Sequence, residues 1–439
     1  MTWQTARELR FKRWLSPPGL AFVSEKARAT YQDRVRRIIR AISLDFTPDR
    51  VPIFPNYTFL PAYVMGSSAR EVMNDQDRAL EIWGQFGDEF AFDSVNFYGI
   101  SCPIPLMKSL QYRLYQWPGS PGLPPDHSYR YVDKDWLRSP EEYGAMAEDP
   151  SDYWLRRYIP RVCGALSGLS QIDRLTTFSE LPSLAGFLAS FGRKDVRQSL
   201  INLMKSGQLA LEWVTKADAF ISGCAAKGQP SFAGSFAKAP FDLMTDTFRN
   251  KKSSLLDITR HPEILVEAME ALTKPSIHQA LEDIDRTGNP LVFMPLHTGD
   301  DTFMSPEQFE KFYWQPLKKV LTGLIEAGGV PLLFAEGSYK NRLDYFLDLP
   351  KASVCWMMDR VDLASAKKKV GHHCCLAGNV PAYMFLSDDA EAMKRYCRQL
   401  IEDVAPGGGF MLSSGHSLDK AQRSMVETMI ETTLSYGLY

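Results

Sequence analysis

Residues 305–337 read SPEQFEKFYWQPLKKVLTGLIEAGGVPLLFAEG, and this stretch decides the fold class. Ser305 is a good helix cap, Pro306 suits the first helical position and Glu307 suits the first turn, so a helix is predicted to begin here. The apolar run after the paired glycines is predicted to be a buried strand, with Glu336 at its end. A helix followed by a buried strand is the repeating unit of an α/β fold.

The same alternation runs through the second half of the chain. Strands are predicted at residues 289–297, 330–337, 353–359, 372–379 and 409–415, and helices at 261–288, 305–329, 362–371, 388–408 and 420–437. Short apolar strands of this kind are typical of a parallel sheet that is buried on both faces. Their alternation with helices favours a (β/α)8 TIM barrel over an open sheet.

The first half is less regular. Helices are predicted at 25–42, 67–90 and 180–223, and short strands at 51–54 and 92–99. Residues 112–160 are rich in Tyr, Trp, Pro and Asp and are predicted to form an irregular insertion over one face. Residues 1–25, with several cations and a Pro-Pro-Gly break, are interpreted as an N-terminal arm, which leaves residues 26–439 as one barrel domain.

Bulk composition excludes several classes of protein. The chain has 439 residues, 45% of them hydrophobic, and a net charge of −2, so nucleic-acid binding is not expected as the main activity. We find no apolar run long enough to span a membrane and no secretory pattern at the N-terminus. Seven cysteines are few and odd in number, which favours a cytoplasmic protein with reduced thiols.

Three segments of the second half carry a family resemblance. They are residues 304–337, LAGNVP at 376–381, and IEDVAPGGGFMLSSGHSLD at 401–419. Together they resemble the uroporphyrinogen decarboxylase superfamily, which contains porphyrinogen decarboxylases and corrinoid-dependent methyltransferases. Weaker matches extend through FAKAPFDLMTDTFRN at 236–250 to DRVPIFP at 49–55. The resemblance implies a TIM barrel with its active site at the carboxyl ends of the strands.

One departure bears on the branch of the superfamily. The decarboxylases carry an arginine-rich signature of the RQAGRY type near the N-terminus, which holds an acidic tetrapyrrole. This chain has PNYTFLPAY at residues 55–63 in about that place, without an arginine. Because a substrate with many carboxylates needs cationic donors, the resemblance favours the methyltransferase branch.

A second departure concerns metal binding. The methyltransferases often hold zinc through a His-x-Cys pair and a later Cys, and here these places read Phe334-Ala335-Glu336 and His416. If zinc binds, the resemblance implies oxygen and nitrogen ligands, namely Glu336, His416 and His297, with Asp301 as a further candidate. The alternative is that no metal binds. Either way, a thiol acceptor is not expected, since the thiolate ligands are missing.

The candidate site residues all follow predicted strands, where the active site of a TIM barrel lies. We predict catalytic roles for Glu336, His416, His297 and Asp301, and substrate-binding roles for Asn379, Asp300, Tyr57 and Tyr98. Each has a structural alternative: the aspartates can cap turns, Glu336 can be a hydrogen-bonded structural residue, and the tyrosines can pack in the core. The aromatic insertion is interpreted as a subdomain core, a homodimer contact or a wall of the pocket.

The run GHHCC at residues 371–375 looks like a zinc motif but is predicted to be part of a strand. Neighbouring side chains of a strand point to opposite faces, so these four side chains cannot surround one ion. They also lie near the amino end of the strand, away from the expected site.

The predicted function is therefore a methyltransferase of one-carbon metabolism. It moves a methyl group between a cobalamin on a partner corrinoid protein and a small non-thiol molecule, such as a methoxylated or phenolic compound or a pterin. The alternative is a cofactor-independent decarboxylase acting on a non-porphyrin or porphyrin substrate. A third class, a binding or scaffold protein on a degenerate barrel, also stays open.

Overall fold

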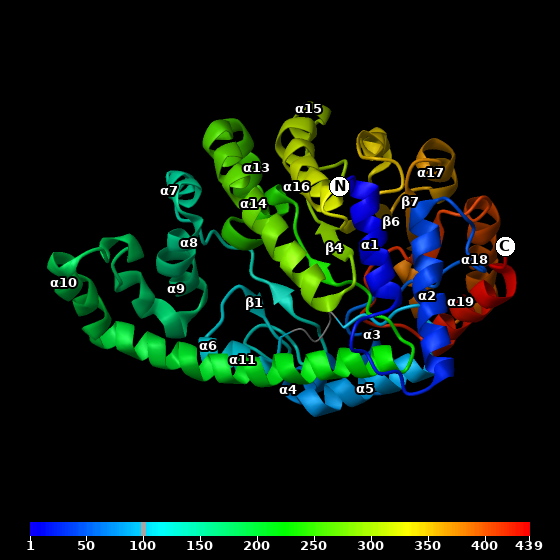
Figure 1. Cartoon of the computed structure of the whole chain (residues 1–439), viewed down its shortest axis with the longest axis horizontal. Helices are drawn as coiled ribbons and strands as arrows, with labels where there is room; N and C mark the ends of the chain where they lie inside the picture. The colour runs from blue at the N-terminus through cyan, green and yellow to red at the C-terminus, as the bar shows by residue number, and fades with distance from the viewer. Residues whose placement is uncertain (98–101) are drawn as a thin grey trace.

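A ring of parallel strands forms the centre of the computed structural model, which describes residues 1–97 and 102–439 (Figure 1). Six strands are hydrogen-bonded in chain order, β3-β4-β5-β6-β7-β8. Their bounds are β3 Ser235–Phe236, β4 Leu291–Leu296, β5 Val330–Ala335, β6 Cys355–Met358, β7 Cys375–Val380 and β8 Phe410–Ser414. Strand order equal to chain order, with helices between the strands, confirms the predicted alternation.

Two extended segments from the first half close this sheet into a barrel. Residues 52–54 pair with β8 through two hydrogen bonds to Leu412, each 2.8 Å long. Residues 93–95 lie between that segment and residues 230–232, joined to both by hydrogen bonds of 2.9 Å. The ring thus has eight members, and the predicted TIM barrel is confirmed.

Two of the predicted helices are broken, and one predicted strand begins later than expected. The predicted helix 180–223 is divided at Arg193 into α10 Leu181–Gly192 and α11 Lys194–Ala226. The predicted helix 67–90 is broken at Asp75, whose side chain caps the second part by accepting from Arg78 N at 3.0 Å. Strand β7 begins only at Cys375, because His372 and His373 lie in a turn. The remaining long helices are α5 Gln76–Glu89, α11 Lys194–Ala226, α13 Lys251–Arg260, α14 Pro262–Thr287, α16 Gln315–Glu326, α17 Leu363–Val370, α18 Ala390–Val404 and α19 Arg423–Tyr436.

The amino ends of the strands are closed by a helix. Helix α2, Glu25–Ser43, places Tyr31, Val35 and Ile38 against the first inward residues of the strands, including Leu291 and Val330. All of these side chains are almost fully buried. Burying a large aliphatic side chain contributes roughly 1.5–3 kcal/mol, so the floor of the barrel is a stabilising core and not a binding site.

The predicted N-terminal arm is not free. Helix α1, Trp3–Leu15, lies beside α2 and buries Phe11 and Trp14 in the same core (Figure 1). Arg10 donates to Ala327 O at 2.8 Å, and Arg7 donates to Ala352 O. Because these contacts lie at the base of the barrel, α1 is an integral part of the fold.

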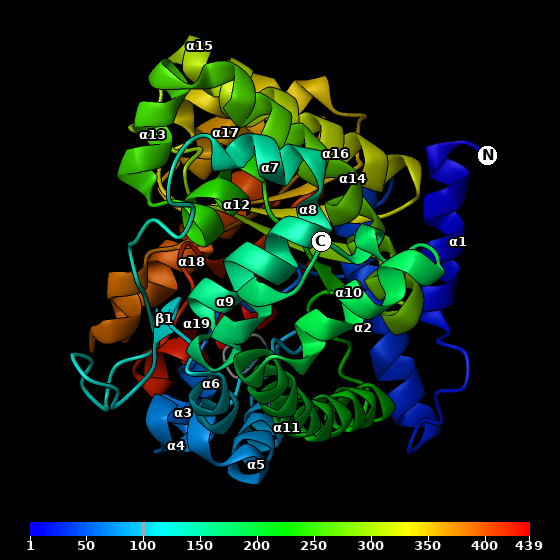
Figure 2. The ribbon, with the colours of Figure 1, turned by 90° about the vertical axis from the view of Figure 1, so that its left-hand side faces the viewer.

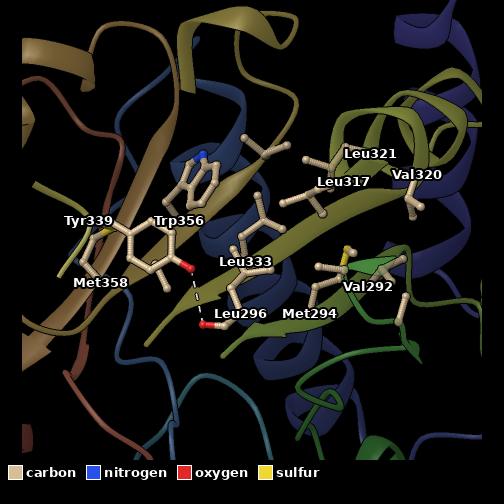
Figure 3. Close-up of a cluster of buried hydrophobic side chains, with 14 of the residues drawn as sticks. Val292, Met294, Leu296, Leu317, Val320, Leu321, Leu333, Tyr339, Trp356 and Met358 are labelled. Carbon is tan, nitrogen blue, oxygen red and sulfur yellow. Dashed lines mark hydrogen bonds between the residues drawn. The ribbon is translucent and has the colours of Figure 1, made fainter. Parts of the chain in front are cut away.

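The outer face of the sheet packs against helices. Val292, Met294 and Leu296 of β4 alternate with the inward residues and meet the apolar face of α16 (Figure 3). Trp356 and Met358 of β6 complete this layer. An inner and an outer core on alternate residues explain why the strands read as continuous apolar runs.

The insertion is more helical than predicted. A short hairpin of β1 Tyr115–Gln116 and β2 Arg130–Tyr131 is followed by α7 Glu142–Glu148, α8 Pro150–Tyr153, a π-helical turn at 154–158 and α9 Ile159–Val162. Its rings pack around Phe248, with Trp154 at 4.6 Å and Tyr158 at 4.9 Å between centroids. Several of these aromatic side chains therefore pack in a core that is continuous with the outer face of the barrel, and α10 Leu181–Gly192 and α11 lie beside the insertion (Figure 1).

The shorter helices connect these parts. They are α3 Leu60–Val64, α4 Ala69–Asn74, α6 Ile104–Leu110, α12 Pro240–Leu243 and α15 Pro306–Gln308. In the part of the chain that the structure describes, no helix is long and apolar enough to cross a membrane. All seven cysteines are free thiols.

Candidate active site

Three titratable side chains lie side by side at the carboxyl ends of neighbouring strands. The register pairs Leu296 with Ala335, and Ala335 with Met358. The next residues on these strands are His297, Glu336 and Asp359, which continue the inward-facing positions. Side chains at this edge of a TIM barrel form its active site, so the strand register itself assembles the candidate site.

His297 is held by two polar neighbours. Its Nδ1 donates to Asp246 Oδ2 at 2.5 Å, and its Nε2 lies 3.6 Å from Glu336 Oε1. The Lys238 ammonium donates to the same Asp246 oxygen. Asp246 follows α12 and Lys238 follows β3, so the site draws on a third βα connection of the barrel.

The charges of this group shift its pKa values in opposite directions. Burial works against ionisation of Asp246, but the hydrogen bonds and charges of His297 and Lys238 outweigh it and hold the Asp246 pKa well below its usual range. Burial also works against protonation of His297, yet the bond to Asp246 and the charge of Glu336 raise the His297 pKa. Near neutral pH, Asp246 is therefore a carboxylate and His297 tends toward the imidazolium form.

Glu336 is the group with acid–base character. Burial raises its pKa, and the nearby charge of Asp242 adds to the increase, while His297 and His416 oppose it. Its side chain keeps 33% of its surface exposed, so the carboxyl group remains reachable. A partly exposed glutamate with a raised pKa is suited to give and take a proton in catalysis.

Asp242 lies beneath the site, and among the described residues no cationic side chain donates a hydrogen bond to it. It is completely buried and accepts from His297 N at 3.0 Å, Thr298 N at 2.9 Å and Tyr313 OH at 2.6 Å. Burial raises its pKa, and the charge of Asp246 raises it further. Through the His297 backbone bond, Asp242 fixes the position at which the histidine leaves the strand.

The carboxylates of Asp300 and Asp301 connect two loops. They do not face the barrel mouth, which is the opening at the carboxyl ends of the strands. Asp300 accepts from Thr302 N at 2.8 Å and Ser338 N at 2.5 Å. Asp301 accepts from Ser338 Oγ at 2.9 Å and Asn341 N at 3.2 Å. These bonds tie the loop after β4 to the loop after β5. This geometry favours the structural alternative over the predicted catalytic role of Asp301 and substrate-binding role of Asp300.

Gly337 makes this loop contact close. Its φ of +91° is a conformation that side-chain-bearing residues rarely adopt, and a Cβ there would lie 2.1 Å from Asp300 Oδ2. The glycine next to Glu336 is therefore required by the loop.

Two other predicted residues also have structural partners. Asn379 donates to Asp359 O at 2.9 Å and Val361 O at 2.6 Å, so its amide holds the loop after β6. Tyr57 is a correction: it is buried in the helix layer, where it packs against Phe86 and Phe92. Its side chain is on the opposite face from the inward Phe54, and so it does not line the mouth.

His416 lies on the loop after β8 and is exposed. Its ring centroid is 6.4 Å from that of Phe334, and its charge acts on both Glu336 and Asp359. It is thus at the rim of the same mouth, where an incoming molecule can reach it. Tyr98, the last predicted residue, lies outside the described residues.

Lys238, Asp242, Asp246 and Asp359 were missed by sequence reasoning. The first three recur every four residues in FAKAPFDLMTD, a spacing that places polar groups on one side of a helical turn. That regular spacing inside an apolar segment was the available signal. Asp359 directly follows an apolar strand, as Glu336 does, and could have been found by the same reasoning.

Comparison with known proteins now adds to this geometry. The sequence profile of the family described as uroporphyrinogen decarboxylase (URO-D) matches residues 206–435. The chain belongs to the uroporphyrinogen decarboxylase family. The matched region contains β3 to β8 and every side chain of the site described above, so the family resemblance seen in the sequence is confirmed.

Two known proteins are similar to this chain, one over part of its length and one over most of it. A uroporphyrinogen decarboxylase of Thioalkalivibrio sulfidiphilus is 27% identical over 123 residues, which is 26% of this chain and 33% of that protein. The match thus spans about a third of that relative. A methyltransferase from Methanosarcina mazei superposes with a TM-score of 0.58 over 91% of this chain and 98% of that one, at 15% identity. At this identity the likeness concerns the fold.

Proposed function

We propose that this protein is a corrinoid-dependent methyltransferase of the uroporphyrinogen decarboxylase family. It moves a methyl group between a cobalamin carried by a partner corrinoid protein and a small non-thiol molecule. A methoxylated or phenolic compound or a pterin fits the second role. The fold is shared with a methyltransferase of the same general architecture, so it is compatible with this reaction class.

The observation that carries the proposal is the pairing of Glu336 with a charged His297 at an open strand end. The two side chains are 3.6 Å apart, and 33% and 26% of their surfaces remain exposed. Asp246, which also accepts from Lys238, raises the pKa of His297 from the side opposite Glu336. Methyl transfer to or from oxygen or nitrogen requires a proton to move at that atom, and this pair can supply or accept one.

The chain's own residues perform the proton transfer in both directions. When the small molecule gives up its methyl group, the protonated Glu336 donates a proton to the departing oxygen or nitrogen. When the small molecule accepts a methyl group, the Glu336 carboxylate takes the proton from it. His297 stabilises the carboxylate form in each case, because its charge lies close to the Glu336 oxygen. The corrinoid supplies the cobalt that gives or receives the methyl group.

The arrangement of these residues does not favour a zinc site. In residues 1–97 and 102–439 no group of three His, Cys, Asp or Glu side chains is placed to hold a metal ion. We therefore derive no step through zinc, and Glu336, His416 and His297 stay predicted metal ligands only. Cys355, Cys374 and Cys375 lie at the amino ends of their strands, so they offer no thiolate at the mouth.

A cofactor-independent decarboxylase is the second candidate. It is favoured by the matching segment of a uroporphyrinogen decarboxylase and by the cations Lys238 and His297, which can hold a substrate carboxylate. In this reaction Glu336 would protonate the carbon that loses carbon dioxide. The two candidates share the residues but differ in their need for cobalt.

The decisive experiment follows the visible spectrum of cobalt. Purified protein is mixed with cob(I)alamin and candidate methyl donors, and with methylcobalamin and candidate acceptors, with and without a native corrinoid protein. We expect conversion between the two cobalt spectra that depends on Glu336. Release of carbon dioxide without cobalt would support the decarboxylase, whereas unchanged spectra with every candidate would contradict the methyltransferase. Metal analysis of the wild type and His416→Ala tests the zinc prediction separately.

A further inference from the structure

A second cavity lies in the insertion, on side chains that the candidate active site does not use. Its volume is about 430 Å³, and its walls come from Arg113, the loop 134–138, residues 156–161 and the 3-10 helical segment 164–171. Helix α9, which contributes to its wall, lies to the left of the barrel in Figure 1 and faces the viewer in Figure 2. It shares no lining residue with the His297–Glu336 mouth.

The cavity has a strong excess of positive charge. Six of its lining residues are cations, and a single carboxylate, Asp135, lies among them. The cations are Arg113, Lys134, Arg138, Arg156, Arg157 and Arg161. The chain as a whole has a net charge of −2, so this concentration of arginine is local and not a general property of the surface.

The chain neutralises only part of this charge. Arg156 forms a two-pronged pair with Asp152 at 2.6 and 2.8 Å, and Arg161 forms one with Glu142 at 2.6 and 2.7 Å. Asp135 is turned to other partners, since it accepts from Asn250 N at 3.0 Å and Ser253 Oγ at 2.9 Å. These pairs hold the two arginines rigidly in the wall.

The other cations have little compensation. Among the residues that the structure describes, the side chains of Arg113 and Arg138 make no ion pair, and Lys134 lies over the Trp136 ring at 4.9 Å. Arg157 is 3.9 Å from a Glu142 oxygen that already serves Arg161. Like charges gathered in one cavity repel each other, so an anion that enters it gains several attractive contacts at once.

A buried donor provides independent support. Trp136 lines the cavity and is only 5% exposed, yet its indole Nε1–H has no hydrogen-bond partner within the described residues. Leaving such a donor unsatisfied costs about 1–3 kcal/mol, and buried donors are normally paired. Because Trp136 is a lining residue of the cavity, an acceptor bound there is the candidate partner of this donor.

We propose that this cavity binds a small polyanion, an organic phosphate or a polycarboxylate. Arginine forks match the paired oxygens of both groups, and the Trp136 N–H and the hydroxyl of Ser167 add neutral donors. The volume suits a small metabolite and not a macromolecule. The proposal does not depend on the reaction that occurs at the barrel mouth.

The test is calorimetric titration of the full chain with pyrophosphate and, separately, with tricarballylate. The first variant is Arg113→Gln/Arg138→Gln, which removes two cations that have no structural partner. Its matched control is Lys194→Gln/Arg197→Gln, which removes two exposed cations of α11 that do not line the cavity. The second variant is Trp136→Phe, which keeps the ring and removes the donor.

We expect saturable binding of at least one probe, with affinity that falls as salt rises. The arginine variant should bind at least about tenfold more weakly, and Trp136→Phe about two- to tenfold more weakly, because one hydrogen bond is lost. The control variant should match the wild type. The stronger of the two probes identifies phosphate or carboxylate as the natural group.

Three outcomes would overturn the proposal. They are absence of saturable binding by both probes at about 0.15 M salt, equal affinity of the arginine variant and its control, and binding that Trp136→Phe leaves unchanged. Thermal unfolding of each variant without a probe verifies folding, and the wild-type transition should rise with the bound probe.

Discussion

Asp93 and Asp242 are both completely buried in this barrel, at opposite ends and with opposite kinds of partner. Asp93, at the amino end, accepts from Arg37 at 2.6 Å and from Arg50 at 2.9 Å. Asp242, at the carboxyl end, is bonded to hydroxyl and backbone donors and to no cation. The ion pairs of Asp93 at the amino end stabilise the fold. A buried carboxylate without a cation partner, such as Asp242, can still change its protonation state at the site.

The largest effect is expected at the open end. Glu336→Gln removes the group that gives and takes the proton but keeps its size, so turnover in the cobalt assay should fall about 10²- to 10⁴-fold. Stability should change little, since the side chain is partly exposed. Glu326→Gln, an exposed position at the end of α16, is the control. If both variants turned over equally, Glu336 would have no catalytic role.

The next effect concerns the closed end. Asp93→Asn leaves Arg37 and Arg50 with one fewer anion in a buried position, and the free energy of unfolding should fall by about 3 kcal/mol. Urea denaturation measures this change. Asp33→Asn removes the exposed partner of Arg36 on the same helix and should cost less than about 1 kcal/mol. Equal losses in the two variants would remove the distinction between the two ends.

A smaller effect is expected for the donor to Asp242. Tyr313→Phe removes the 2.6 Å bond and should cost about 1–2 kcal/mol of unfolding free energy. The loss should be greater at higher pH, because the ionised carboxylate accepts a stronger bond and burial holds the Asp242 pKa above its usual range. Tyr383→Phe, at a position 71% exposed, is the control. A loss that did not vary with pH would mean that Asp242 keeps one charge state.

The smallest effect is a pH dependence of stability at His297. Its pKa is raised above the ordinary 6.5 by Asp246, so the protonated form stabilises the folded state. This contribution is complete below pH 6.5 and is lost as pH rises through the raised pKa. The stability difference between wild type and His297→Gln should therefore shrink from pH 6 to alkaline pH. A difference that grew over this range would contradict the assigned charge.

Much of the fold was predictable because its strands are continuous apolar runs between capped helices. The same regularity located His297 and Glu336, since each directly follows such a run. The segment 51–57 was harder: it is too short to show which side chains face inward, and this is why Tyr57 was wrongly placed in the mouth. In residues 140–162 large aromatic side chains conceal the helical period, so helices α7 to α9 were predicted as irregular structure.

The residues that bond to His297 could not be predicted from the sequence, for a different reason. Asp246 lies 51 residues before His297 in the chain. The two meet only because β3 and β4 are adjacent strands and the loops that follow them lie at the same end of the barrel. A short-range pattern identifies each residue as polar within an apolar segment. It does not show which polar residues will meet.

Helix α2 covers the amino end of the barrel, so the candidate site is approached from the carboxyl ends of the strands. Under the proposed function, both the small molecule and the carrier protein use the rim near His416, and a carrier protein seated there would block a small molecule still outside. Under the proposed function, the small molecule must therefore enter first and leave last. Steady-state kinetics would show this compulsory order as a pattern of product inhibition that a barrel open at both ends would not give.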